Sequence, residues 1–170
     1  MSDERSAPIE RWKDNPYAVD LGDMDVMRAL ADTPERLRSL AERMTPAQFA
    51  RSYAPGKWTA AQLFAHLAHV ELAFSLRVRM AVTSDAYVVQ PFEQDDWLVR
   101  EPAIPGLEAF RGYYAMRQFN LPLYHSLTPA ERRRALTHPE RGPMIVEWIL
   151  ESLAGHERHH LPHFEIIAKS

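Results

Sequence analysis

Four histidines lie within eight residues in the stretch GHERHHLPHFE, residues 155–165. Imidazole nitrogens bind divalent metal ions and exchange protons near neutral pH, so these side chains could do metal or acid–base chemistry. His156 and His160 are four residues apart, which on a helix places both rings on one face, one turn apart. This spacing can present two rings to one ion, but it is equally typical of partly buried histidines that are only hydrogen-bonded.

Helical phase separates the inward histidines from the outward ones. The apolar residues of this segment share one face: Ile145, Ile149, Leu153, Phe164 and Ile167. His156 and His160 fall within that face. His163 falls at its edge, whereas His159 is displaced towards the flank. The cluster therefore has an inward pair, a surface residue and one residue whose position depends on the local bend.

A second candidate segment, WTAAQLFAHLAHVELAFSLRVRM, carries His66 and His69. Its apolar stripe consists of Leu63, Leu67, Val70, Phe74 and Val78. His66 borders this stripe and His69 points well away from it, so His66 is the better core candidate. The alternative is that His66 is a boundary residue with one nitrogen in solvent. We predict that His125 and His138, outside both stripes, lie at the surface.

The elements that would position these residues are helices. Apolar periodicity predicts helices over about 24–44, with a break or restart at Thr33-Pro34, 59–82, 107–127 and 144–167. The stretch 83–105 contains three prolines and no sustained period, which indicates a long crossover. We expect an all-α fold, an antiparallel four-helix bundle with this crossover between the second and third helices, or alternatively an irregular helical domain.

Composition narrows the class of protein. The 170 residues suit a single domain, 1–170, with a less regular lead over about 1–20. The net charge of −3 provides no basic surface for nucleic acid. No apolar run is long enough to span a membrane, and the first residues lack a signal-peptide core, so we expect a cytoplasmic protein. Without cysteine, a metal must be held by nitrogen or oxygen.

Three stretches together resemble the DinB/YfiT-like superfamily: GKWTAAQLFAHLAHVE, YVVQPFEQDDW and HPERGPMIVEWILESLAGHERHHLPHF. The resemblance implies a four-helix bundle that binds a divalent metal ion through one histidine of the second helix and two of the last. By position these are His66, His156 and His160. It also implies a homodimer that acts on a small molecule, either as a metal-dependent hydrolase or as a transferase or isomerase using an external low-molecular-weight thiol.

Three neutral imidazoles would leave the charge of the ion intact and at least one coordination position open, as in catalytic sites. Nickel and zinc both suit such ligands. We therefore favour a hydrolase that activates water, with thiol transfer as the alternative. A third hypothesis is a non-catalytic, metal-stabilised stress or binding protein. In that case Glu71, Glu93, Asp95 or Asp96 would close the coordination sphere, or no metal would bind.

No catalytic acid or base can be assigned from the sequence. Glu157 is predicted on the charged side of the last helix, too far round to reach the ion, whereas Glu93 or Asp96 of the crossover could approach it. Pro162 lacks the N–H that would bind the carbonyl of Arg158, so it should bend the last helix or end it early. Such a bend could bring His163 to the ion, or to one of its ligands as a hydrogen-bond donor.

Overall fold

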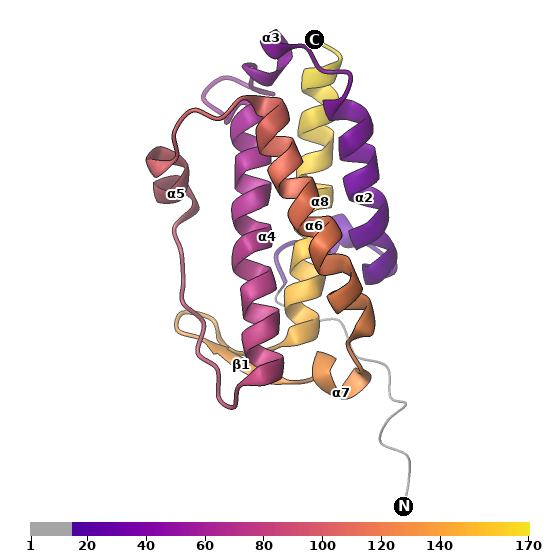
Figure 1. Ribbon diagram of the computed structural model, residues 1–170, viewed down its shortest axis with the longest axis vertical. Helices are drawn as coiled ribbons and strands as arrows, with labels where there is room; N and C mark the ends of the chain where they lie inside the picture. The colour runs from indigo at the N-terminus through magenta and orange to yellow at the C-terminus, as the bar shows by residue number, and fades with distance from the viewer. Residues whose placement is uncertain (1–14) are drawn as a thin grey trace, which may run out of the picture.

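A bundle of four long helices forms the body of the protein in the computed structural model, which describes residues 15–170 (Figure 1). The helices are α2 (Val26–Ala41), α4 (Ala60–Thr83), α6 (Gly106–Ser126) and α8 (Val146–Ala168). The prediction of a mostly helical four-helix bundle is confirmed. Within the described residues, no helix is both long and apolar enough to cross a membrane.

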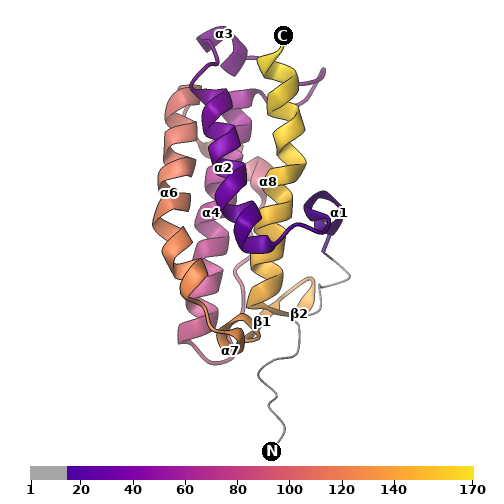
Figure 2. The same ribbon diagram turned by 90° about the vertical axis from the view of Figure 1, so that its right-hand side faces the viewer.

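Each long helix packs against two others, in the order α2, α6, α4, α8 and back to α2. The helices α4 and α6 run in the same direction, as do α2 and α8, while the contacts between these two pairs are antiparallel (Figures 1 and 2). Two consecutive helices can be parallel neighbours only if the connection returns along the bundle. The crossover between α4 and α6 does this, as the sequence predicts.

A local signal explains where α4 begins. Thr59 accepts a hydrogen bond from the backbone N–H of Gln62, and the side chain of Gln62 accepts one from the N–H of Thr59. This capping box satisfies backbone donors that the first turn of a helix leaves free. The same arrangement begins the short helices α3 (Pro46–Phe49) and α7 (Pro129–Arg132).

Pro34 does not interrupt the first long helix, so the predicted break at Thr33-Pro34 is wrong. A proline has no N–H for the carbonyl four residues earlier, here that of Leu30. In the structure that carbonyl accepts a hydrogen bond of 3.1 Å from the side chain of Arg117. Pro122 and Pro162 also lie inside helices, and α8 continues past Pro162 instead of ending there.

Two small features were not predicted. An antiparallel hairpin, β1 (Ala135–His138) and β2 (Gly142–Ile145), precedes α8 at one end of the bundle (Figure 2). The crossover contains a short helix, α5 (Gln94–Arg100), and Val88 forms an isolated bridge with Thr137 of β1. Strands of four residues and a helix of seven are too short for periodicity to reveal them.

A short helix, α1 (Ala18–Leu21), packs across α8. It is part of the stretch predicted as a less regular lead; residues 1–14 of that lead lie outside the described residues. Close approach is possible because α8 has Gly155 at the crossing. A Cβ atom there would lie 2.4 Å from the backbone oxygen of Tyr17. The ring of Tyr17 meets the ring of His156 edge-on, at 5.0 Å between centroids.

The core consists of two apolar clusters separated by buried polar side chains. Members of one cluster are Val70, Val78, Tyr124, Ile149 and Leu153. Members of the other are Leu37, Leu63, Phe64, Phe110 and Phe164. Along α4, α6 and α8 the residues between the clusters form what we call the polar layer: His66, Glu71, Arg117, Asn120, His156, Glu157 and His160.

Arg117 of α6 is the centre of the polar layer. Its guanidinium donates to Glu71 of α4 at 2.6 Å and to Glu157 of α8 at 2.9 Å, with a further, shorter contact to Glu157. Asn120 and Tyr124 donate to the other oxygen of Glu71, at 2.7 and 3.1 Å. The prediction that Glu157 lies on a charged outer side is wrong, because this buried partner draws it inwards. Burial raises the pKa of Glu157 to about 7, against the opposing effect of Arg117.

We expect Arg117→Met to lower the free energy of unfolding by about 3–5 kcal/mol, because it leaves two buried carboxylates without a cation. Urea denaturation followed by circular dichroism measures this change. The control is Arg111→Met, which removes an exposed pair with Glu108 and should cost less than about 1 kcal/mol. Equal, small losses in both variants would show that the polar layer does not depend on this charge.

A second expectation concerns Gly155. Gly155→Ala should force α1 away from α8 and destabilise the protein by about 1–3 kcal/mol. Gly112→Ala is the matched control, since Gly112 lies in α6 with nothing within 4 Å of an added Cβ. That change should stabilise the protein by about 0.5–1 kcal/mol. Thermal denaturation of both variants measures the difference, and a stabilising Gly155→Ala would contradict the close crossing.

Candidate metal centre

Three histidines from two helices converge in the polar layer. His66 comes from α4, and His156 and His160 come from successive turns of α8. The Nε2 atom of His156 lies 2.8 Å from that of His66 and 3.0 Å from that of His160. One ligand atom from each ring lies within 4.8 Å of the others. The structure thus brings together the three side chains that helical phase places inwards.

Burial keeps these rings neutral. Desolvation, reinforced by the neighbouring histidines, lowers the pKa of His66 to about 4 and that of His160 to about 2. The same causes lower the pKa of His156 well below its usual value. A neutral imidazole retains a lone pair on one nitrogen, which is the form that coordinates a metal ion.

The Nε2 atoms of the cluster also fit a cation. Within residues 15–170, the buried Nδ1 atoms of His66 and His156 have no hydrogen-bond partner, while Nδ1 of His160 lies 3.3 Å from Nδ1 of His163. Rings protonated at Nδ1 would direct three Nε2 lone pairs at one another. Such lone pairs repel unless a positive charge lies among them, so this donor set suits a metal ion.

The remaining histidines of the opening stretch lie outside this group. His159 is exposed and close to Asp20, at 3.3 Å, as predicted for a surface residue. His163 is half-buried, stacks on Tyr53 at 3.8 Å between ring centroids and contacts His160. Pro162 therefore leaves His163 beside one of the three converging histidines.

Two histidines expected away from the core are buried. His69 packs edge-on against Trp97 of α5 and lies 3.2 Å from Glu101, so it holds the crossover against α4. His138, predicted at the surface, is buried because β1 is folded back beneath the crossover. His125 is exposed, as predicted.

None of the four acids considered as further ligands belongs to the group formed by His66, His156 and His160. Both oxygens of Glu71 are occupied by Arg117, Asn120 and Tyr124. Asp95 and Asp96 are exposed on α5. Glu93 lines a pocket of about 350 Å³ that reaches His156. Of these acids, only Glu93 is among the residues that line the pocket.

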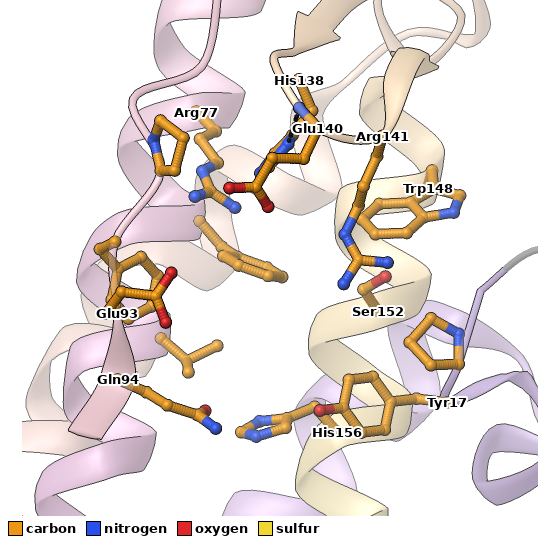
Figure 3. A pocket seen from close by; sticks show the side chains of 15 residues that line it. Tyr17, Arg77, Glu93, Gln94, His138, Glu140, Arg141, Trp148, Ser152 and His156 are labelled. Atoms are coloured by element: carbon orange, nitrogen blue, oxygen red, sulfur yellow. Dashed lines mark hydrogen bonds between the residues drawn. The ribbon is translucent and has the colours of Figure 1, made fainter.

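This pocket extends from His156 along α4 as far as Arg77 (Figure 3). Its walls include Val70, Phe74, Phe92 and Trp148. Arg77, His138, Glu140 and Arg141 also line it. Helical phase could have indicated Arg77, because it lies eleven residues, or about three turns, after His66 and thus near the same face. Nothing in the sequence indicates that the hairpin brings Arg141 to this place.

Comparison with solved structures gives a close match in fold. The structure of YfiT from Bacillus subtilis, described as having an unusual four-helix bundle topology, matches with a TM-score of 0.77. The match covers 96% of this chain and 91% of that one at 21% sequence identity. At this identity the likeness establishes the fold alone.

Sequence comparison finds curated relatives over most of the chain. A protein of Oceanobacillus iheyensis is 26% identical over 141 residues, 82% of each chain. A protein of Geobacillus kaustophilus is 26% identical over 155 residues, 85% of this chain and 84% of its own. YfiT itself is 23% identical over 152 residues, 84% of this chain and 82% of its own. All three are provisionally named metal-dependent hydrolases. The sequence model of the DinB superfamily matches residues 29–163, so the chain belongs to that superfamily.

Proposed function

We propose that the protein is a metal-dependent hydrolase acting on a small molecule. The observation that carries the proposal is the convergence of three neutral imidazoles, one of which, that of His156, lines a pocket. The provisional names of the relatives support the same class of activity.

His66, His156 and His160 would hold the ion through their Nε2 atoms. Nickel and zinc are the ions that best suit three imidazoles. With three neutral ligands, such an ion would supply Lewis acidity, which can lower the pKa of bound water and polarise a carbonyl group. A three-membered set would leave coordination positions for this chemistry, and the side chains in residues 15–170 that could hold an ion form a group of three.

Other side chains pack against two of the three histidines. The ring of Trp58 lies against His66, at 4.8 Å between centroids, and Tyr17 lies against His156. These ring contacts restrict the orientations that both imidazoles can adopt. Glu93, the crossover acid that lines the pocket, is our candidate for proton transfer.

The first test is metal content. We expect the purified protein to hold about one divalent ion per chain. His66→Ala and His156→Ala should each reduce the bound metal at least about tenfold, measured by inductively coupled plasma mass spectrometry. His159→Ala is the control, since His159 is exposed on the same helix, and its metal content should not change. Normal metal content in His156→Ala would rule out the three-histidine assignment.

The second test is metal-dependent turnover. A panel of small esters and amides should include substrates whose hydrolysis stops when a chelator removes the ion and returns when nickel or zinc is added. We expect His156→Ala to lower kcat/KM by about a hundredfold or more, as for the loss of a catalytic metal. Pairs of a low-molecular-weight thiol and an electrophile form a second panel. Metal-dependent turnover in that panel alone would replace hydrolysis by thiol transfer.

A further inference from the structure

The pocket beside His156 contains a buried cation whose charge the mechanism does not use. Arg77 of α4 lines the pocket and is only 6% exposed. Its guanidinium lies over the rings of Phe74 and Phe92, at 4.9 and 5.7 Å from their centroids. It donates one hydrogen bond, of 3.3 Å, to the backbone carbonyl of Gln90. These contacts fix the position of the guanidinium but do not neutralise it.

No carboxylate neutralises this charge within the described residues, because no ion pair forms between Arg77 and any acid of residues 15–170. Buried charges in proteins are normally paired, since an isolated one is costly. Arg117, only forty residues away in sequence, shows the usual solution with its two glutamates. Among the described residues 15–170, Arg77 is therefore a buried cation without a carboxylate partner.

A second arginine faces the same space. Arg141, in the turn between β1 and β2, projects its guanidinium into the pocket (Figure 3). Burial lowers the pKa of Arg77, and the charge of Arg141 lowers it further, although Tyr87 has the opposite effect. The two cations therefore repel each other across the pocket. An anion placed between them would relieve both the repulsion and the missing pairing.

Two acids also line the pocket, but neither is the missing partner. Glu93 and Glu140 are exposed, and neither forms an ion pair with Arg77 or Arg141 in the described part of the chain. The backbone N–H of Glu140 donates to Nδ1 of His138, which fixes the turn and not the carboxylate. Exposed carboxylates are screened by water, so they oppose an incoming anion only weakly.

We propose that Arg77 and Arg141 bind a compact oxyanion, a carboxylate or a phosphate, on the molecule that reacts at the histidine cluster. In Figure 3, Arg77 and His156 lie at opposite ends of the pocket. Phe74, Phe92, Val70 and Trp148 provide apolar walls between the two ends. The substrate thus has an anionic end, an apolar body and a reactive group at the other end. The assignment of the reactive end rests on the proposed function; the anion site does not.

Isothermal titration calorimetry on the full-length protein as purified, at low salt, tests the anion site. The probes are benzoate, its neutral counterpart benzamide, and phenyl phosphate. We expect the tighter of the two anions to bind at least about tenfold more strongly than benzamide, because a charge-assisted hydrogen bond is lost in the amide. Tighter binding of benzoate assigns a carboxylate to the substrate, and tighter binding of phenyl phosphate assigns a phosphate.

Variants locate the binding. Arg77→Met and Arg141→Met should each weaken anion binding about tenfold while leaving metal content unchanged. Arg79→Met is the matched control: Arg79 lies on the same helix, but it donates to Asn120 and lies over Phe119, outside the pocket. The affinity of Arg79→Met for the anions should equal that of the unchanged protein. If Arg77→Met fails to fold, Arg141→Met decides, because Arg141 is exposed in a turn.

Several outcomes would overturn the proposal. These are equal binding of benzamide and both anions, no binding of either anion, or full anion affinity in both arginine variants. In the last case the anion is held elsewhere, for example at the histidines. Absence of bound metal together with arginine-dependent anion binding would reject the proposed function and leave the anion site standing. The two proposals can therefore fail separately.

Discussion

The burial of one positive charge in the middle of the bundle constrains everything around it. Arg117 binds Glu71 of α4, Glu157 of α8 and a backbone carbonyl of α2, so one side chain of α6 contacts all three other long helices. A buried guanidinium tolerates few arrangements of its partners, because each misplaced carboxylate leaves charge unpaired. The polar layer thereby fixes how the helices are aligned along the bundle axis. The apolar clusters on either side could pack in several such alignments.

The histidine cluster depends on the same alignment. Glu71 lies five residues after His66 on α4, and Glu157 directly follows His156 on α8. If α4 or α8 shifted along the other, two sets of contacts would be lost at once. The carboxylates would move away from Arg117, and the imidazoles would move away from one another. Arg117 thus positions the histidines without touching them. The pocket extends from this level along α4 to the hairpin, so its far end is set by how β1 and β2 pack.

Features that depend on helical phase and helix capping could be predicted from the sequence. The four long helices, the crossover, the capping box at Thr59 and the inward position of His66, His156 and His160 belong to this class. The wrong predictions concern partners distant in the chain. Helical phase places Glu157 on the charged outer face of α8, but the structure buries it. Its burial is explained by the contact with Arg117, forty residues earlier in the chain. Pro34 suggests a break in the helix when only the sequence is known. In the structure, Arg117 donates a hydrogen bond to the carbonyl of Leu30, which the proline leaves without its usual donor.

The parallel arrangement of α2 and α8 has a consequence for how the chain folds. The last long helix packs against segments about ninety and more than a hundred residues earlier, so its docking closes a long loop and is expected to be slow. Until α8 docks, Arg117 keeps Glu71 but lacks Glu157, and the side of the polar layer that α8 covers would be open to water. Such an intermediate is poorly stabilised. The bundle should therefore assemble and come apart in one cooperative step, with no persistent three-helix form exposed to proteases.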